Sequence, residues 1–353
     1  MHSIHKNNID LKSSFIFKLN YQKFKLKTMS QKAAFIDQLS LPAISAPMFL
    51  ISGPELVIEC CKNGIVGTFP ALNQRSSEGF EEWLIQIKTE LKQWEEETGK
   101  KAAPFGVNIV VHPTNPRVEA DVKLCVKHQV PLVITSLGAV QMVVDAIHSY
   151  GGLVFHDVIK KRHAQKAAEA GVDGLILVAA GAGGHAGTIN PMTLVAEIKT
   201  FFDKTIILSG CISNGRDIAS AMQMGAHLAY MGTRFINTKE SLAPTAYKDM
   251  IEDSGASDVT YTKAISGVHA NFLSKSLAAA GLTEEDLAKD QKIDFGKEMD
   301  TEAKAWKTIW SAGQGVASIE DTLPVADLVT KLKTEFKSAI EEQAKLLETF
   351  PKD

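Results

Sequence analysis

Residues 161–188 read KRHAQKAAEAGVDGLILVAAGAGGHAGT, and this stretch carries the clearest evidence for the type of fold. It begins with a segment of helical periodicity, passes through Gly171, and continues as the apolar run GLILVAA (174–180) and a glycine-rich loop. A helix that ends in glycine and leads into a continuous apolar strand is typical of a parallel sheet covered by helices. The stretch therefore predicts one α/β unit of such a sheet.

The same order of elements recurs along the chain from Leu41 onward. In PELVIECCKNG (54–64), for example, Pro54 suits the first turn of a helix and Gly64 suits the position just after its end. Eight such units fit a closed (β/α)8 TIM barrel better than an open doubly wound sheet. The eight expected strands are AISAP (43–47), GIVGTF (64–69), FGVNIVV (105–111), PLVITS (131–136), LVFHDV (153–158), GLILVAA (174–180), TIILSG (205–210) and HLAYMG (227–232).

The pattern breaks after the eighth strand. Residues 242–311, including SLAAAGLTEEDLAKD (276–290) and EMDTEAKAWKTIW (298–310), have helical but irregular character and are expected to form an inserted helical subdomain. The barrel itself is expected to comprise residues 29–241 and 312–353, closed by a final helix. Residues 1–28 are rich in lysine but lack the apolar run of a secretory signal and the arginines of a transit peptide, which predicts a disordered extension.

Composition excludes several classes of function. The 353 residues include 38 Lys and Arg against 41 Asp and Glu, so there is no basic excess of the kind that drives nucleic-acid binding. No apolar run approaches the roughly 20 residues that span a bilayer. The four cysteines form no CxxC pair and no zinc-like spacing with histidine. We therefore expect a cytoplasmic protein with reduced thiols, no metal site, no nucleic-acid partner and no membrane partner.

In barrels of this kind the chemistry lies in the loops that follow the C-terminal ends of the strands. The loops after strands seven and eight commonly bind a phosphate group together with a helix N-terminus. Here they read SGCISNGRD (209–217) and MGTRF (231–235), in which glycines alternate with small hydroxyl residues. Residues 213–215 are expected to start a helix that points its positive end inward. The sequence therefore predicts a phosphate-bearing ligand, although each glycine alone could serve only a tight turn.

The loop after the sixth strand contains GAGGHA (181–186), which matches the loose dinucleotide pattern GxGxxA. A Rossmann fingerprint should open a helix directly and have an acidic residue about 20 positions further on. Here GTINP (187–191) intervenes, and Pro191 suits the first turn of the next helix. The glycines instead indicate close approach of the backbone to a flat ligand. His185 is then the one side chain of the loop that can exchange a proton near neutral pH, unless its role is structural.

Taken together, SAPM (45–48), GVN (106–108), GGHAG (183–187), SGCIS (209–213) and MGTRF (231–235) resemble the nitronate monooxygenases. The resemblance extends from Leu41 to Phe235 and resumes more weakly at WSAGQGV (310–316). It implies an FMN-dependent oxidoreductase with a TIM-barrel fold. The implied reaction is the oxidation of alkyl nitronates or nitroalkanes by O2 to a carbonyl compound and nitrite. The motifs are more specific for this FMN-barrel superfamily than for the reaction.

The resemblance also implies roles for individual residues. His185 falls on the catalytic base, which must be neutral to take a proton from carbon and is expected to have a pKa near the working pH. Asp157 departs from the pattern, because some members have a lysine there that could stabilise a reduced, anionic flavin. The expected cofactor contacts are Pro47, Met48, Asn108 and Gly183 at the flavin ring, Ser209, Gly210, Gly232 and Thr233 at the phosphate, Gln314 closing over the ring, and Phe49, His156, Gly184 and Cys211 beside them.

Two other functions remain open at this point. The FMN-dependent enoyl-acyl-carrier-protein reductases carry a similar Gly-Gly-His loop but take hydride from NAD(P)H. A flavin- or phosphate-binding barrel without catalysis is the second alternative. The expected partners are a small nitro or nitronate substrate and O2, and a homodimer is compatible with the resemblance. Reduction of the flavin by NADH would distinguish the reductase from the monooxygenase.

Overall fold

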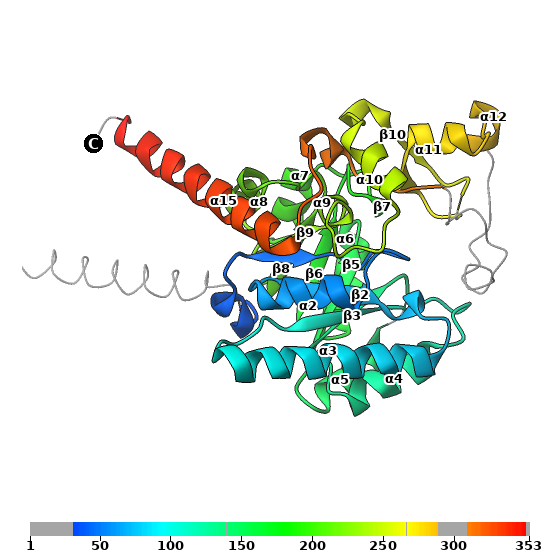
Figure 1. Cartoon of the computed structure of the whole chain (residues 1–353), viewed down its shortest axis with the longest axis vertical. Coiled ribbons are helices and arrows are strands. Elements are labelled where there is room, and N and C mark those ends of the chain that lie inside the picture. The colour runs from blue at the N-terminus through cyan, green and yellow to red at the C-terminus, as the bar shows by residue number, and fades with distance from the viewer. Residues whose placement is uncertain (1–30, 139, 266, 289–308, 351–353) are drawn as a thin grey trace, which may run out of the picture.

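The computed structural model describes residues 31–138, 140–265, 267–288 and 309–350 (Figure 1). The extension expected at residues 1–28 lies outside these ranges, as does most of the helical segment expected at residues 298–310. Within the described ranges, no helix is both long enough and apolar enough to cross a bilayer.

Eight parallel strands close into a barrel, which confirms the predicted fold class (Figure 1). Each strand pairs with the next in the order β1, β2, β3, β4, β5, β6, β8 and β9, and β9 pairs with β1. Seven of the eight strands fall within the predicted runs, and β2 extends one residue beyond its run, to Pro70. Their bounds are β1 Ala43–Ser45, β2 Val66–Pro70, β3 Phe105–Val110, β4 Leu132–Ser136, β5 Leu153–Val158, β6 Gly174–Val178, β8 Thr205–Ser209 and β9 Leu228–Met231.

Successive side chains of each strand alternate between the barrel interior and the surrounding helices. One cluster of buried side chains, which includes Phe155, Ile176 and Tyr230, fills the interior. A second and larger cluster lies between the strands and the helices. Because Phe155 faces inward, Asp157 shares its face at the C-terminal end of β5, whereas His156 faces the helical layer.

The helix ends that the sequence marks with proline or glycine are found at those residues. Pro54 and Pro191 lie in the first turns of α2 and α7, and Gly225 ends α8 in the left-handed conformation with φ 102°. The helices are α2 Pro54–Lys62, α3 Ser77–Thr98, α4 Val118–Lys127, α5 Gln141–His148, α6 Lys161–Glu169, α7 Pro191–Ile198 and α8 Gly215–Met224, with the 3-10 turns η1 Ala34–Gln38 and η2 Ala71–Asn73.

The inserted segment contains strands as well as helices. Part of the glycine loop forms β7 (Gly184–His185), which pairs antiparallel with β11 (Ala270–Leu273), and β11 pairs in turn with β10 (Val259–Thr262). The sequence pattern predicts only helices here, because such short apolar runs cannot be assigned by periodicity alone. The other elements are α9 Thr233–Ile236, α10 Thr245–Glu252, η3 Ala256–Asp258, α11 Ser274–Ala279 and α12 Glu284–Leu287.

The chain returns to the barrel through η4 (Gln314–Ser318) and ends with α15 (Val325–Glu348). The first half of α15 packs on the barrel against α8, with Val325, Leu328 and Leu332 buried. Its C-terminal turns extend beyond the barrel (Figure 1). The close contact between α15 and α8 affects the phosphate site considered below.

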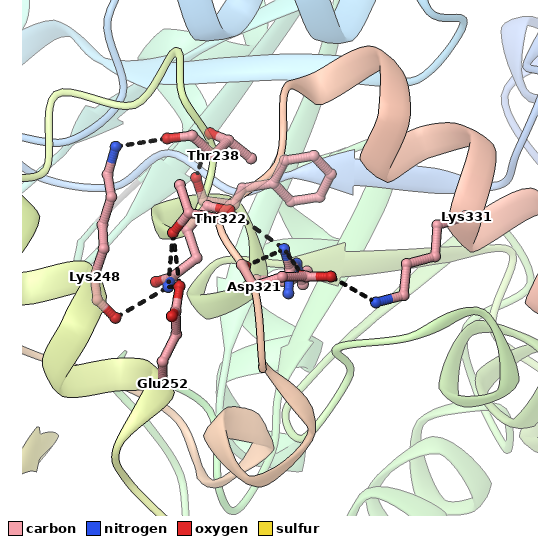
Figure 2. A network of polar contacts seen from close by, with 9 residues as sticks. Thr238, Lys248, Glu252, Asp321, Thr322 and Lys331 are labelled. Atoms are coloured by element: carbon pink, nitrogen blue, oxygen red, sulfur yellow. Dashed lines mark hydrogen bonds and ion pairs between the residues drawn. The ribbon is translucent and has the colours of Figure 1, made fainter.

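A polar network fixes the segment before α15 to α9 and α10 (Figure 2). Arg234 of α9 is 2% exposed, donates from Nη2 to the backbone oxygen of Asp321 at 2.8 Å, and forms an ion pair of 2.9 Å with its carboxylate. Asn237 donates to Glu252 at 3.0 Å and to Thr322 at 3.3 Å. The network therefore joins the loop after β9 to the segment that follows η4.

We expect Arg234→Ala to lower the free energy of unfolding by about 2–4 kcal/mol, because the substitution removes a buried side chain and leaves the backbone oxygens of Asn237 and Asp321 without their donor. Lys331→Ala is the matched control. Lys331 pairs with the other oxygen of Asp321 at 2.9 Å, but its side chain is 45% exposed, so its loss should cost less than about 1 kcal/mol. Urea denaturation of the two variants measures both values. Equal destabilisation would contradict a special role for the buried guanidinium.

Candidate active site

A cavity of about 420 Å³ opens at the C-terminal ends of the barrel strands. Its volume lies within the range of small-molecule sites in proteins. Its wall is formed by the loops after the strands and by part of the segment from residue 309 to residue 315. Most of the predicted site residues line it, namely Pro47, Met48, Phe49, Asn108, Gly183, Gly184, His185, Ser209, Gly210, Cys211, Gly232 and Thr233.

Two of the predicted site residues do not line the cavity. His156 is buried on the outer face of β5, where its Nδ1 lies 2.8 Å from the Oγ1 of Thr135. Burial, together with the nearby His163, lowers the pKa of His156 to about 4. Strand alternation places the neighbouring Asp157 in the cavity wall instead. We therefore remove His156 from the candidate cofactor contacts.

Gln314 lies next to the cavity wall and is exposed. Its backbone N–H donates to the oxygen of Gly181 at 2.9 Å, and the residues on either side of it, Gly313 and Gly315, line the cavity. The Sγ of Cys211 lies 4.0 Å from its side-chain oxygen. The structure thus places Gln314 beside the glycine loop rather than within the cavity.

The inserted segment holds one side of the glycine loop. Asn271 of β11, which is 4% exposed, donates from Nδ2 to the backbone oxygen of Ala182 at 2.7 Å. The Tyr261 hydroxyl donates to the oxygen of Ala186 at 2.9 Å, and the N–H of Ala186 donates to the oxygen of His269 at 3.3 Å. Nothing in the local sequence marks Asn271, because its partner lies far upstream in the chain. These contacts fix the backbone on both sides of His185.

The segment around Gly313 holds the other side of the loop. A Cβ atom at Gly183 would lie 2.8 Å from the Gly313 nitrogen, so only glycine permits this approach. The same nitrogen donates to the Thr233 hydroxyl at 2.9 Å. The glycines thus let two protein segments touch, which the sequence analysis did not foresee. Around Gly184, in contrast, a Cβ would meet nothing within 4 Å, and this residue lines the cavity.

His185 lines the cavity, and desolvation by burial lowers its pKa to about 4. The expectation that its pKa lies near the working pH is therefore wrong. Burial penalises the imidazolium and so keeps the ring neutral. The neutral imidazole can still accept a proton, and the neutral form is the one that a general base requires.

A chain of hydrogen bonds crosses the ends of three neighbouring strands. Asn108 on β3 donates from Nδ2 to the Ser136 hydroxyl on β4 at 2.8 Å, and that hydroxyl donates to Oδ2 of Asp157 on β5 at 2.7 Å. The other carboxyl oxygen, Oδ1, is buried and has no hydrogen-bond partner among the described residues. Burial raises the pKa of Asp157 to about 7, against the opposing effect of the Ser136 hydrogen bond.

The N-terminus of α8 is not available to an anion in the way that the sequence suggested. Asp217 accepts from the backbone N–H groups of Ser213 and Asn214 at 2.9 and 3.2 Å. The N–H of Gly215 donates to Glu335 of α15 at 2.8 Å, and a Cβ at Gly215 would lie 2.2 Å from the oxygen of Leu332. Because α15 covers this helix end and two carboxylates occupy it, a phosphate there would meet negative charge.

Residues 210–212 and 232–233 remain as the candidate phosphate site, and all of them line the cavity. Gly232 and Thr233 begin the short helix α9, an arrangement that TIM barrels commonly use for phosphate. Gly210 has φ 126°, which a side chain rarely tolerates. At Gly232 the nearest atoms to a Cβ, on Ala46 and Met48, would be 3.8 Å away, so this position borders open space.

The described part of the cavity wall contains no lysine or arginine. Its titratable side chains are those of Asp157, His185, Cys211, Tyr230 and Tyr247. Apolar residues dominate the remainder, and the rings of Tyr247 and Trp310 stack with centroids 4.9 Å apart. Such a wall favours a neutral or weakly polar substrate over one with a large charge.

The amino-acid sequence matches a protein family and several related proteins. The family profile described as nitronate monooxygenase matches residues 71–335. A Rhodococcus jostii protein named (3aS,4S,5R,7aS)-5-hydroxy-7a-methyl-1-oxo-octahydro-1H-indene-4-carboxyl-CoA dehydrogenase is 26% identical over 67% of this chain and 63% of its own length. The nitronate monooxygenase of Paraburkholderia phytofirmans is 32% identical over 49% of this chain.

The match to the Paraburkholderia protein covers 51% of that protein's length. This chain therefore spans only about half to two thirds of the length of these two relatives. Among solved structures, the nitroalkane oxidase from Streptomyces ansochromogenes superimposes with a TM-score of 0.74 at 23% identity, covering 88% of this chain and all of the other. This likeness supports the fold.

Proposed function

The chain belongs to the nitronate monooxygenase family of oxidoreductases, and from this premise we propose that it is an FMN-dependent enzyme that oxidises nitroalkanes and nitronates with O2. The products would be a carbonyl compound and nitrite. The observation that carries the proposal is His185, a neutral imidazole held in the wall of a cavity that also contains a candidate phosphate site.

The described residues fit a flavin mononucleotide. Residues 210–212 and 232–233 would hold one terminal phosphate with backbone N–H groups and the hydroxyl of Thr233. Pro47, Met48 and Asn108 would face the ring, and the apolar wall would exclude water around it. The unpartnered Oδ1 of Asp157 indicates that a polar group of a ligand belongs nearby. When bound, the flavin would accept electrons from the substrate and pass them to O2.

His185 would take the proton from the carbon that carries the nitro group. Contacts with Asn271 and Tyr261 and the close approach of Gly313 hold the loop that carries the imidazole in place before substrate binds. The absence of Lys and Arg from the described wall favours entry of the neutral nitroalkane, which becomes a nitronate only after His185 has acted.

The pH dependence follows from the lowered pKa of His185. A base with a pKa near 6.5 would lose about 30-fold in its neutral fraction at pH 5, whereas one with a pKa of about 4 would lose less than about twofold. We therefore expect kcat/KM for neutral nitroethane to stay nearly constant from pH 6 down to pH 5. In Asp157→Asn the Asp157 carboxyl no longer titrates, and the pH profile of kcat/KM should show the same flat acid limb. A steep acid limb in both proteins would contradict this state of His185.

Oxygen uptake with nitroethane, in the absence of any nicotinamide, tests the proposed function. We expect O2 consumption accompanied by nitrite formation. Flavin reduction that requires NADH, without nitrite, would favour the enoyl-reductase alternative instead. A flavin-containing protein that turns over no nitro compound and is not reduced by NADH would favour a binding protein without catalysis.

A further inference from the structure

Asp157 is a half-buried acid with a buried Oδ1 atom, and the proposed reaction does not explain its place in the site. It lies at the C-terminal end of β5, faces the barrel interior, and forms part of the cavity wall. Its Oδ2 accepts from Ser136, which in turn accepts from Asn108. Because Oδ2 is an acceptor, Oδ1 is the atom that can carry a proton.

Among the described residues, no cationic side chain lines the cavity around Asp157 that would hold it as a carboxylate. Its strand neighbours are Ser136 on β4 and Ile176 on β6, neither of which titrates. Tyr230 on β9 is the titratable side chain that interacts with it across the barrel. His185, Cys211 and Tyr247 are the other titratable groups of the described wall, which contains no lysine or arginine. A carboxylate here would be a buried charge without a counter-ion.

We propose that Asp157 carries a proton on Oδ1 at neutral pH or below and donates it in a hydrogen bond to the ring of the bound flavin, as a neutral acid in place of a cationic side chain. This inference rests on the proposed function, because it requires that the cavity holds a flavin. The pKa of about 7, raised by burial, agrees with it. A protonated Asp157 also adds no negative charge to the site when an anionic nitronate is formed there.

The proposal has a consequence for flavin binding. Below about pH 7 the neutral acid offers a donor, whereas above it the carboxylate repels a reduced, negatively charged flavin. We therefore expect the dissociation constant of reduced FMN to rise by about tenfold or more between pH 6 and pH 8.5 in the wild-type protein. The flavin reduction potential should fall more steeply over the same interval than the flavin alone would require.

Asp157→Asn and Ser136→Ala form the test. Asparagine has nearly the same shape and cannot ionise, so both pH effects should disappear while FMN still binds. Ser136→Ala removes the donor that favours the carboxylate, so the inflection should move to higher pH. The measurements are FMN titration under reducing conditions and spectroelectrochemistry, neither of which depends on turnover.

The outcomes separate this inference from the function on which it rests. A wild-type protein that binds no flavin at any pH would overturn both. A protein that binds FMN, but whose potential and dissociation constant run parallel to those of Asp157→Asn across the pH range, would overturn the role of Asp157 alone. An inflection that Ser136→Ala leaves unmoved would also contradict it, because the Ser136 hydroxyl is the recorded donor to this carboxyl group.

Discussion

Replacing His185 with asparagine should lower kcat/KM for neutral nitroalkanes by about 10²–10⁴-fold, the range that general-base removal typically causes. Preformed nitronates have already lost the proton, so they should be affected much less. Asparagine keeps a polar side chain of similar reach but cannot act as a base. The difference between the two substrates is therefore the diagnostic result, and steady-state kinetics on matched pairs of nitroalkane and nitronate measure it.

The FMN content of the variant serves as the control in this experiment. The backbone on both sides of His185 is fixed by Asn271, Tyr261 and Gly313, so the substitution should leave the loop in place. If both substrates slowed by the same factor while FMN remained bound, His185 would not be the base. The neutral imidazole in the cavity wall would then need a different explanation, such as binding of the nitro group.

Gly232→Asp should weaken FMN binding by about 10²–10³-fold, because it places a carboxylate beside the proposed phosphate site and like-charge contacts cost several kcal/mol. Gly232 has φ −98° and no neighbour within 3.8 Å of a new Cβ, so the backbone can accept a side chain. Gly232→Asn is the matched control, with the same size and no charge. It should weaken binding far less.

Gly210 is a less suitable position for this charge test, although the sequence marks it equally. Its φ of 126° and the 3.0 Å approach of the Ala180 oxygen mean that any side chain strains the backbone. Loss of FMN from a Gly210→Asp variant could thus reflect misfolding. Equal dissociation constants for Gly232→Asp and Gly232→Asn, measured by fluorescence titration, would contradict a phosphate at this end of the barrel.

Local sequence patterns predict the barrel well. The eight strands are mainly apolar, since both of their faces are buried, and several are followed by helices that begin at proline or end at glycine. The loops that line the cavity follow from the fold, because the C-terminal ends of parallel barrel strands meet at one face. His185 and the residues around Gly210 and Gly232 could be located in this way.

Contacts between distant segments could not be predicted in the same way. Nothing local to Asn271 shows that it bonds to Ala182, and nothing near Gly215 shows that α15 covers it. The hairpin of β10 and β11 could not be predicted, because its strands have only four residues each. The sequence could, however, have predicted which of His156 and Asp157 faces the cavity. Side chains alternate along a strand, so Asp157 shares the face of the interior residue Phe155.

Anaerobic mixing of the flavin-loaded protein with a nitroalkane tests the central claim most directly, because it isolates the transfer of electrons from substrate to cofactor. The proposed function predicts that the visible flavin absorbance falls without NADH and returns when O2 is admitted, with nitrite released. It also predicts that a preformed nitronate causes the same change in the His185→Asn variant, while the neutral nitroalkane does so far more slowly. A flavin whose spectrum is unchanged by either substrate, yet is reduced at once by NADH, would contradict it.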